Sequence, residues 1–425
     1  MSLVIPSVAS APILKQISLC THHALPMDVL RLICSFLNDP KDIVHWGLTN
    51  KRLGVLLSDH ELWNLFLDKH FPCSYAKHSP KTENLNFYKR LVNIEQQIKT
   101  GKYRLQTLKG HQDWVSCIAV WRGKLISSSH DKTIKIWDLN TGQKIQTLKG
   151  HQHEIRCLTI WENRLISGSE EIKLWDLNTG QELQTLKGYE SRIHCMVTWK
   201  NKLISNSYYE HTIKIWDLDT GRELQTLKGH QDLIKSMIIF NDTLISGSHD
   251  KTIKIWDLNT GKMVQTLNAH RGMIKCMTLW RNTLISGSHD RTIKTWDLNT
   301  GKELEPLKGR QKWISGLMIL APDKLISSSN HKIKIWDLNT KEKLRTLKSH
   351  QSLIRCMTIL GDKLISGSDD RTIKIWDPYT GKELKTLEEH TDWISSLIVV
   401  DPDMLISSSY DKTIKIWNFN SAALP

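Results

Sequence analysis

Paired His and Asp residues are the first feature of this 425-residue chain that could do chemistry, because such a pair can act as a general base. Five pairs recur at a nearly constant spacing: His111–Asp131, His230–Asp250, His270–Asp290, His350–Asp370 and His390–Asp411. Each pair lies at the same place in a repeated segment, and none has a nucleophile specific to it. We therefore interpret the pairs as a structural frame and expect no catalytic residue.

Other signatures of catalysis are missing from the sequence as well. The chain has no Walker loop, nucleophile elbow, zinc-ligand spacing or dinucleotide fingerprint. We therefore predict a protein that is not an enzyme and that uses no cofactor and no metal.

A Trp that is usually followed by Asp marks the end of a strand-like run in each repeated segment. These tryptophans stand about forty residues apart: Trp137, Trp175, Trp216, Trp256, Trp296, Trp336, Trp376 and Trp417. Each segment holds four short runs of alternating apolar and polar residues with turn residues between them, which predicts four antiparallel strands. In the first segment the runs are WVSCIAV, KLISSS, TIKIWD and KIQTL.

Segments of this kind, which begin near Gly-His and reach Trp-Asp, resemble the WD repeat over residues 102–420. The resemblance implies an eight-bladed WD-repeat β-propeller, so the predicted fold class is mainly β with a small all-α region before it. In that family a hydrogen-bond chain runs from the Trp through a strand Ser and the His to the turn Asp. The resemblance implies this chain in blades one, four, five, seven and eight. Blades two, three and six depart from the pattern, at Glu170–Glu171, at Glu210 and at Arg310.

The sequence of predicted strands begins with an outer strand and ends with an inner one. Eight runs of the xLQTL kind occur, and the first of them, residues 103–108, precedes the first inner strand. Only eight residues follow Trp417, too few for a good outer strand. We therefore predict that residues 103–108 complete the last blade and close the ring, which removes an exposed sheet edge.

The formal net charge of +14 makes nucleic acid an obvious partner to consider. The lysines recur at fixed repeat positions, however, so that a lysine at one surface position of the repeat appears up to eight times in the chain. We interpret them as a solvated basic rim and do not expect nucleic acid as a partner. No apolar run is long enough for a membrane helix, and no membrane partner is expected.

Five of the eight cysteines share one repeat position inside an apolar run: Cys117, Cys157, Cys195, Cys276 and Cys356. No CxxC pair occurs. We interpret these residues as small buried hydrophobic groups in a reducing compartment, the cytosol or the nucleus. The near-verbatim recurrence of TIKIWDLNTG also leaves open that the gene belongs to a microbe that supplies the protein to a eukaryotic host cell.

A second pattern fills residues 22–70, where Leu-Pro, Ile-x-x-Phe-Leu, Asp-Ile, Leu-Thr-Asn-Lys-Arg-Leu and Leu-Trp follow one another. Apolar residues at helical spacing predict three short helices. The order of the motifs resembles the F-box, and an F-box directly before a propeller is a known architecture. The resemblance implies docking on a Skp-type adaptor and, through it, on a cullin-RING ligase. The adaptor contacts that it implies are Leu25, Pro26, Leu30, Ile33, Leu37 and Leu48.

The remaining N-terminal residues are assigned by composition and periodicity. Residues 1–21 are predicted to be a flexible tail, with a targeting or dimer-forming segment as the alternative. Residues 71–101 form the predicted helical linker. Within it, residues 83–99 have helix-like apolar spacing, which predicts a helix that holds F-box and propeller at a fixed distance. A loosely packed helix is the alternative.

The candidate ligand site is a column of residues near the start of each innermost strand. In blades one to eight the column reads Ser116, Arg156, His194, Lys235, Lys275, Ser315, Arg355 and Ser395. Two residues earlier it reads Trp114, Glu154, Arg192, Leu233, Met273, Trp313, Leu353 and Trp393. We predict a cationic arc of Arg156, Arg192, His194, Lys235 and Lys275 in blades two to five, and an aromatic arc of Trp313, Trp393 and Trp114 in blades six, eight and one. Arg355 of blade seven is expected between the tryptophans.

F-box receptors of this family that bind phosphorylated degrons carry arginines at this place in the repeat. Guanidinium and ammonium groups pair with phosphate or carboxylate, so we predict an acidic or phosphorylated degron as the ligand. Ordinary exposed charges at a strand end are the alternative. The predicted function is the substrate-recognition subunit of an SCF-type ubiquitin ligase. A WD-repeat scaffold or RNA-binding protein with a non-functional F-box is the competing hypothesis.

Overall fold

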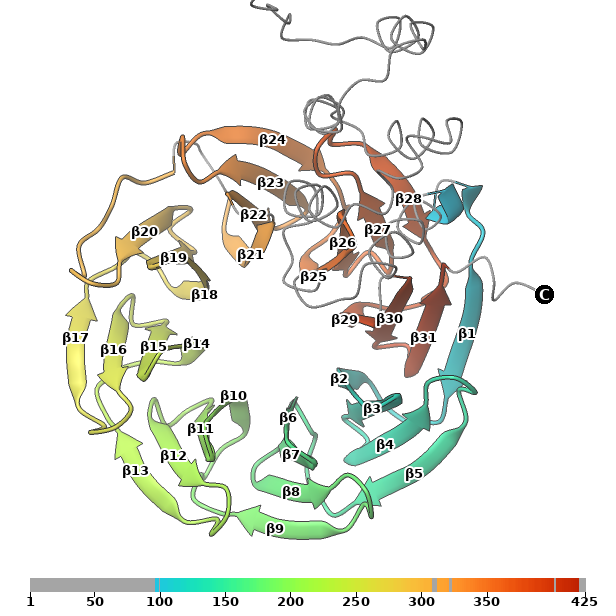
Figure 1. Ribbon diagram of the computed structural model, residues 1–425, viewed down its shortest axis with the longest axis horizontal. Helices are drawn as coiled ribbons and strands as arrows, with labels where there is room; N and C mark the ends of the chain where they lie inside the picture. Colours follow the sequence, from blue (N-terminus) through green and yellow to red (C-terminus); the bar gives the residue numbers. More distant parts are fainter. Residues whose placement is uncertain (1–95, 99, 308–311, 321–322, 401–402, 420–425) are drawn as a thin grey trace, which may run out of the picture. The chain divides into compact units, whose positions relative to one another are not determined.

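The computed structural model describes residues 96–98, 100–307, 312–320, 323–400 and 403–419. These residues contain eight antiparallel sheets, which follow one another around a ring (Figure 1). The eight-bladed propeller predicted from the repeats is confirmed. The predicted tail, the F-box with its adaptor contacts and most of the linker helix lie outside the described residues.

Blades one to four each contain four strands in sequence order, from the innermost strand to the outermost. Blade one comprises β2 (Val115–Trp121), β3 (Lys124–Ser129), β4 (Thr133–Asp138) and β5 (Lys144–Lys149). Blade two comprises β6 (Cys157–Trp161), β7 (Arg164–Gly168), β8 (Ile172–Asp176) and β9 (Glu182–Leu186). Blade three comprises β10 (Ile193–Trp199), β11 (Lys202–Ser207), β12 (Ile213–Asp217) and β13 (Glu223–Leu227). Blade four comprises β14 (Ile234–Phe240), β15 (Thr243–Ser248), β16 (Ile253–Asp257) and β17 (Met263–Leu267).

Blades five to eight show two variations on this order. Blade five comprises β18 (Ile274–Trp280), β19 (Thr283–Ser288) and β20 (Ile293–Asp297). Blade six comprises β21 (Ile314–Leu320), β22 (Lys324–Ser329), β23 (Lys332–Asp337) and β24 (Lys343–Lys348). Blade seven comprises β25 (Ile354–Leu360), β26 (Lys363–Ser368), β27 (Ile373–Trp376) and β28 (Glu383–Leu387). Blade eight comprises β29 (Ile394–Val400), β30 (Met404–Ser409), β31 (Thr413–Asn418) and, as its outermost strand, β1 (Arg104–Lys109).

The ring closes as predicted, through the first strand of the propeller. Strand β1 pairs with β31 in an antiparallel register that runs from Arg104↔Asn418 to Lys109↔Thr413. The Lys415 ammonium donates a hydrogen bond to the Thr107 hydroxyl at 3.1 Å, and the Leu108 side chain is buried. Each innermost strand also contacts the innermost strands of both neighbouring blades, β29 and β2 included. Residues from the two ends of the propeller are therefore joined by backbone pairing.

Blade five corrects the expectation of eight outer strands. Its segment ELEPL, residues 303–307, makes only an isolated bridge between Trp296 and Glu303 and is not a strand. The cause is Pro306, which stands where most other blades have Thr and which has no backbone N–H for the ladder. The segment remains attached through the Leu304 N–H, which donates to the Thr295 carbonyl at 2.8 Å. The described part of blade five thus has three strands.

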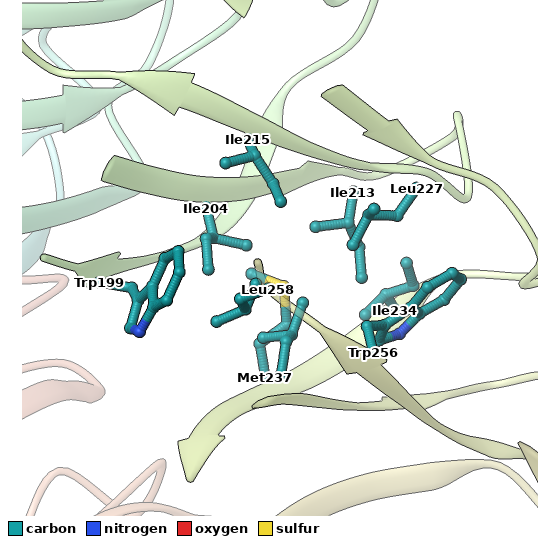
Figure 2. Close-up of a cluster of buried hydrophobic side chains, with 10 residues drawn as sticks. Trp199, Ile204, Ile213, Ile215, Leu227, Ile234, Met237, Trp256 and Leu258 are labelled. Carbon is teal, nitrogen blue, oxygen red and sulfur yellow. The ribbon is translucent and has the colours of Figure 1, made fainter. Parts of the chain in front are cut away.

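Apolar side chains fill the interfaces between neighbouring blades. Figure 2 shows the cluster between blades three and four, where Trp256 and Met237 lie with Ile213 and Leu258. The cluster also contains Trp199, Ile204, Ile215, Leu227, Ile234 and Leu244. Burying one such side chain contributes about 1.5–3 kcal/mol, so the repeated clusters hold the ring together without a central core.

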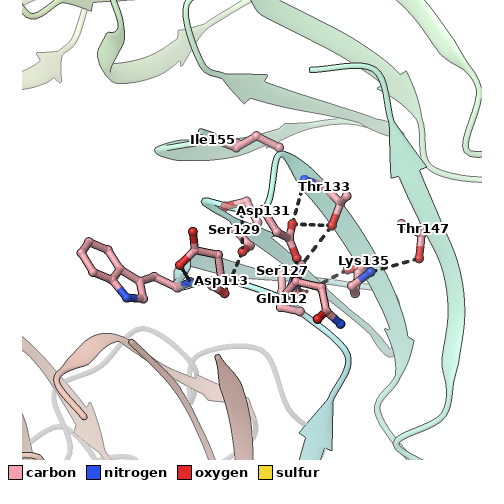
Figure 3. Close-up of polar contacts among 12 residues, drawn as sticks. Gln112, Asp113, Ser127, Ser129, Asp131, Thr133, Lys135, Thr147 and Ile155 are labelled. Carbon is pink, nitrogen blue, oxygen red and sulfur yellow. Dashed lines mark hydrogen bonds and ion pairs between the residues drawn. The ribbon is translucent and has the colours of Figure 1, made fainter. Parts of the chain in front are cut away.

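The predicted hydrogen-bond chain is present in blade one. The Trp137 indole donates to the Ser127 hydroxyl at 2.9 Å, and His111 Nε2 lies 2.8 Å from the same oxygen. His111 Nδ1 lies 2.8 Å from the Asp131 carboxylate. In Figure 3, Asp131 also accepts hydrogen bonds from Gln112 and Thr133. The chain thereby ties the third strand, the second strand and two turns of one blade together.

The same chain occurs in blades four, five, seven and eight, with His Nδ1 to Asp distances of 2.6–2.9 Å. Blade two lacks the Asp, and the buried His151 Nδ1 makes no hydrogen bond within the described residues. In blade three the Tyr189 hydroxyl replaces the imidazole and donates to the Ser205 carbonyl at 2.6 Å. The Trp216 indole still donates to the Ser205 hydroxyl, so this part of the chain survives.

The five Asp residues of these hydrogen-bond chains should cause a steep loss of stability in acid. Burial raises the pKa of each carboxyl, but hydrogen bonds from His and Thr outweigh it and hold the pKa well below its usual range. A carboxyl with a depressed folded-state pKa stabilises the protein above its unfolded pKa of about 4 and loses this contribution as the pH falls further. We expect the free energy of unfolding, measured in urea, to fall steeply below about pH 4. The variant Asp250→Asn should be less stable at neutral pH and should show a shallower acid limb; an unchanged limb would contradict this origin.

The chain enters the propeller through the end of a helix. Residues 96–98 and 100 are helical, and Gly101 ends the turn in a left-handed conformation with φ of 71°. The Lys102 N–H donates to the Gln97 carbonyl at 3.0 Å, which satisfies a carbonyl at the helix end. In the described part of the chain, no helix combines the length and the apolar character that a membrane span requires.

Strand direction defines two faces of the ring. We call the upper face the side on which each innermost strand begins and on which the turn between the second and third strands lies. We call the lower face the side on which each innermost strand ends, together with the turn between the third and fourth strands. This assignment follows from the antiparallel strand order in every blade. The predicted ligand column lies on the upper face.

Candidate functional site

The column predicted from the sequence coincides with a repeated β-bulge. In seven blades the register between the two innermost strands shifts at one residue, which is left without a cross-strand partner. These residues are Ser116, His194, Lys235, Lys275, Ser315, Arg355 and Ser395. A bulge changes the direction of a side chain relative to the regular pleat. The fold therefore provides a common backbone device at the start of the innermost strands.

Blade two reaches a similar position without a bulge. Its innermost strand starts only at Cys157, and the Arg156 N–H donates to the Gly168 carbonyl at 2.9 Å. All nine predicted ligand residues belong to the upper ends of the innermost strands or the segments directly before them. Their contacts with one another decide which of them are available to a ligand.

Two arginines of the predicted cationic arc are already paired. The Glu154 carboxylate lies 3.0 Å from Arg156 Nη2 and 2.9 Å from Arg192 Nη1, through the same oxygen. Glu154 stands two residues before Arg156 in the same blade. One carboxylate thus neutralises part of the charge of two guanidinium groups. The arc is less cationic in blades two and three than the sequence suggested.

Lys235 and Lys275 form the cationic centre of the site. No carboxylate lies within ion-pair distance of either ammonium group in the described part of the chain. Burial, followed by the neighbouring cations of Lys275 and Arg156, lowers the pKa of Lys235 to about 8, while Cys195 acts in the opposite direction. The pKa of Lys275 is also lowered by burial. Two half-buried neighbouring cations without a counter-ion make this the place where an anion gains most.

Aromatic and imidazole rings surround the two lysines. The Tyr208 ring lies 5.9 Å from both the Arg156 guanidinium and the Lys235 ammonium, and its centroid is 4.6 Å from that of His194. Burial, together with the nearby cations of Lys235 and Lys275, lowers the pKa of His194 to about 3. His194 is therefore neutral at physiological pH and offers a hydrogen bond rather than a charge. Tyr208, which the sequence analysis did not single out, is a central residue of the site.

The aromatic arc is a stack of side chains from blades eight and one. The Trp114 and Tyr410 rings are parallel within 14°, with centroids 4.4 Å apart, and Trp393 lies 5.3 Å from Tyr410. Trp114 and Trp393 remain about two-fifths exposed, at 40% and 39%. The third predicted tryptophan, Trp313, stacks instead on His289 at 5.2 Å and is the most exposed of the three at 63%.

Arg355 of blade seven, predicted to lie between the tryptophans, contacts the tryptophan of blade eight. Its guanidinium lies 4.6 Å from the centre of the Trp393 ring and 5.3 Å from that of Tyr410, whereas Trp313 pairs with His289. One guanidinium edge meets the Asp369 carboxylate, with Nη2 at 3.2 Å and Nε in a second close contact. Asp369 immediately precedes the turn Asp of blade seven. Arg355 is therefore neutralised and extends the aromatic surface.

The serines of the column make hydrogen bonds within the propeller. Ser116 Oγ donates to the Ile155 carbonyl and Ser395 Oγ to the Val115 carbonyl, each at 2.6 Å and each in the next blade. Ser315 Oγ lies 2.9 Å from Ser328 Oγ within its own blade. These small residues connect neighbouring innermost strands, and they leave the adjacent tryptophans uncovered.

The repeated His–Asp pairs do not form a hydrolytic site, although Asp131, His111 and Ser127 follow one another as in a nucleophilic triad. Ser127 is fully buried, and its hydroxyl already accepts the Trp137 indole N–H. A nucleophile must reach its substrate, which a buried hydroxyl at a blade interface cannot do. The arrangement is that of a structural frame.

The repeat cysteines are less buried than expected, since all five are partly exposed by residue area. Burial of the sulfur nevertheless raises the pKa of Cys117 to about 11 and that of Cys276 to about 12. The thiols therefore stay protonated and unreactive at neutral pH. Within the described residues, no group of three or more His, Cys, Asp and Glu side chains is arranged to hold a metal ion.

Comparison with known families agrees with the geometry. The model described as "WD domain, G-beta repeat" matches residues 102–138, 221–257, 261–297, 341–377 and 381–418. These five segments end in blades one, four, five, seven and eight, the same blades that have the complete His–Asp hydrogen-bond chain. These five segments of the chain are WD repeats. Among solved structures, the computationally designed Ika8 protein is 33% identical with a TM-score of 0.68, over 73% of this chain and 98% of the designed one.

Curated relatives match over short stretches. The probable E3 ubiquitin ligase complex SCF subunit scon-2 of Neurospora crassa is 34% identical over 73 residues, which is 17% of this chain and 11% of the relative. Subunits named sconB from Aspergillus niger and Emericella nidulans are 38% and 36% identical over 58 residues, 14% of this chain and 9% of each relative. The match therefore spans only about a tenth of each relative's length, 9–11%.

Proposed function

We propose that this chain is the substrate-recognition subunit of an SCF-type ubiquitin ligase. The observation that carries the proposal is the divided upper face, with unpaired Lys235 and Lys275 on one side and the Trp393–Tyr410–Trp114 stack on the other. Such a face suits a peptide with an acidic or phosphorylated residue and an apolar residue in one segment. Phosphate adds up to about two negative charges at pH 7, which matches two neighbouring ammonium groups.

The second part of the proposal concerns residues 22–70. Their resemblance to the F-box supports docking on a Skp-type adaptor and through it on a cullin-RING ligase, with Leu25, Pro26, Leu30, Ile33, Leu37 and Leu48 as contacts. The names of the curated relatives, which are SCF subunits, support the same assembly. Residues 1–21 would then be a tail and residues 71–101 a helical spacer. We place the activity in the cytosol or the nucleus, where the cysteines stay reduced.

In this proposal the propeller contributes recognition and the ligase partners contribute chemistry. The anionic group of the degron binds at Lys235 and Lys275, and the neutral His194 donates or accepts a hydrogen bond beside them. The apolar residue of the degron lies on the exposed rings of Trp114 and Trp393. A substrate held in this way meets the ubiquitin-conjugating enzyme by proximity, so no catalytic side chain is needed in this chain.

Reconstitution tests the assembly directly. The full chain should co-purify with a Skp-type adaptor and, with a cullin and a RING protein, should ubiquitylate a reporter that carries a phosphorylated acidic peptide. Leu30→Asp combined with Ile33→Asp should abolish adaptor binding, because two charges would replace apolar contact residues. The double variant should still bind the free peptide.

The matched control is the double variant Lys235→Met, Lys275→Met. It should still bind the adaptor but should no longer bind the reporter. If the wild type and the Leu30→Asp, Ile33→Asp variant bind the adaptor equally, docking through the F-box is refuted. If both lysines can be removed without loss of reporter binding, the upper-face assignment is refuted.

The competing function is a WD-repeat scaffold or RNA-binding protein with a non-functional F-box, and the net charge of +14 favours it. Its signature would be RNA binding whose affinity falls steeply with salt, together with no binding to the adaptor. The reconstitution above therefore decides between the two functions, because an SCF receptor requires adaptor binding.

A further inference from the structure

The lower face carries a second pattern, in the turns between the two innermost strands of each blade. Like the upper-face column, these turns differ from blade to blade. The innermost strand ends in Trp121, Trp161, Trp199 and Trp280 in blades one, two, three and five, and in Phe240, Leu320, Leu360 and Val400 in the others. The turns of blades one to three contribute five cations, which we call the basic patch: Arg122, Lys124, Arg164, Lys200 and Lys202.

The cations of the basic patch lie over the indole rings. Arg122 and Lys124 lie 5.2 and 5.4 Å from the centre of the Trp121 ring. Lys200 and Lys202 lie 4.4 and 5.1 Å from the Trp199 ring, and Arg164 lies 5.1 Å from the Trp161 ring. A cation over an aromatic face is attracted by the ring quadrupole, which reduces its freedom to move. The patch is therefore an ordered layer of charge rather than a set of independent surface lysines.

The backbone holds the turns of the patch next to one another. Arg122 and Lys200 occupy the tips of tight turns in a left-handed conformation, with φ of 45° and 53°. The Trp121 indole donates to the Glu162 carbonyl at 3.2 Å, which ties the turn of blade one to that of blade two. Arg164 Nη1 donates to the Leu218 carbonyl of blade three at 2.9 Å. Three consecutive blades thus present one continuous surface.

The patch keeps a positive charge after its internal pairs are counted. Arg164 lies 3.6 Å from Asp219, and Lys200 lies 3.0 Å from Asp242. Over the described residues, no carboxylate lies within ion-pair distance of the other three cations, Arg122, Lys124 and Lys202. The corresponding turns of blades six and seven balance Lys324 and Lys363 with Asp323 and Asp362, and the turn of blade eight carries Asp403 and no cation. The lower face is therefore polarised between its two halves.

We propose that the basic patch is a docking surface for an acidic segment of a protein partner. Trp121 and Trp199 are only 9% and 7% exposed, so their rings cannot stack on nucleic-acid bases. Carboxylates also lie among the cations of the patch, at Glu162, Asp219 and Asp242. They would repel a continuous phosphate backbone. In a protein segment, by contrast, basic residues that alternate with acidic ones can pair with these carboxylates. The patch is independent of the proposed degron site, because it lies on the opposite face and shares no residue with it.

Charge reversal on the full chain tests the proposal with a fluorescent peptide of alternating Glu and Ser as the probe. All variants carry Lys235→Met and Lys275→Met, so that the upper face does not contribute. Arg122→Glu, Lys124→Glu and Lys202→Glu together should weaken binding at least about tenfold, as expected for charge pairs lost from one site. The control Lys302→Glu, Lys343→Glu and Lys382→Glu, which changes the net charge equally on other blades, should weaken it less than about twofold.

Equal weakening in the patch and control variants would refute a defined site. Tighter binding of a single-stranded RNA of the same charge, lost in the patch variant, would also overturn the proposal in favour of nucleic acid. Carbodiimide cross-linking of the peptide to the chain that carries only Lys235→Met and Lys275→Met gives a readout that does not depend on the charge-reversed variants folding. The cross-links should concentrate on Lys124, Lys200 and Lys202, and an even distribution over the lysines would refute the proposal.

Discussion

Replacing Lys235 and Lys275 together by Met should weaken the binding of a phosphorylated acidic peptide about a hundredfold or more. Each charge-assisted hydrogen bond contributes about 1.5–3 kcal/mol, and about 1.4 kcal/mol corresponds to a factor of ten in the dissociation constant. Among the described residues the two ammonium groups have no carboxylate partner that must be displaced before binding, so they contribute this energy without a competing loss. Titration calorimetry with phosphoserine and alanine versions of one peptide measures the effect.

The matched control is Arg355→Met, which should change the affinity by less than about threefold. The Arg355 guanidinium is already engaged by the Asp369 carboxylate and by the Trp393 ring, so that a ligand gains little from it. A large loss with Arg355→Met and a small loss with the lysine pair would show that the anion binds on the other side of the face.

The pH dependence of this affinity has a defined sign. Burial and the neighbouring cations lower the pKa of Lys235 to about 8, so the free protein loses this charge at mildly alkaline pH. A bound anion stabilises the ammonium form and raises the pKa again. We therefore expect the affinity to be constant up to about pH 8 and to fall as the pH rises above it. An affinity that is flat to pH 10 would exclude Lys235 from the anion site.

Leu108→Ala in the closing strand should destabilise the propeller by about 2–5 kcal/mol, the usual range for a buried leucine. Leu108 is buried in β1 next to Ile414, in the cluster shared by blades eight and one. Leu148→Ala is the matched variant, because Leu148 holds the equivalent place in β5 and is equally buried. Urea unfolding measures both values.

Hydrogen exchange should separate the two leucine variants even if their unfolding energies agree. Strand β1 joins its blade only through pairing with β31, whereas β5 is connected to β4 by a short turn. Weakening β1 should therefore accelerate exchange in β1 and β31 before global unfolding, and weakening β5 should not produce this early opening. Equal exchange patterns in the two variants would mean that the closing strand is not a separate weak point.

Much of the fold follows from local sequence signals that repeat. Alternating apolar runs, turn residues and Trp-Asp pairs define each blade, and their recurrence about every forty residues predicts the ring. The place of β1 is predictable because residues 103–108 precede the first inner strand and because only a short tail follows Trp417. The His–Asp hydrogen-bond chain is predictable for the same reason, since its members occupy fixed repeat positions.

Exceptions to the repeat show where this reasoning fails. The ELEPL segment of blade five matches the outer-strand pattern at most positions, and one proline is enough to prevent the strand. A comparison of sequence patterns gives every position the same weight. Strand pairing, however, is disrupted when a residue in the hydrogen-bonded ladder has no backbone N–H to donate.

The candidate site depends on contacts between blades, which no single repeat encodes. Sequence alone predicted the column of residues, because they share a repeat position, but the β-bulge that redirects them appears only in the register of the paired strands. Sequence alone also could not show that Glu154 forms ion pairs with two arginines from different blades, or that Tyr410 lies between Trp114 and Trp393.

The order of residues along this chain thus specifies the blades, their number and the strand that closes them, since short-range pattern and periodicity are enough for that purpose. The availability of each charge is set instead by the three-dimensional arrangement, which joins side chains far apart in sequence around one ring. Whether a lysine or an arginine meets a carboxylate depends on neighbours from adjacent blades and on burial. For that reason Lys235 and Lys275 remain open to a ligand while Arg156, Arg192 and Arg355 are already engaged.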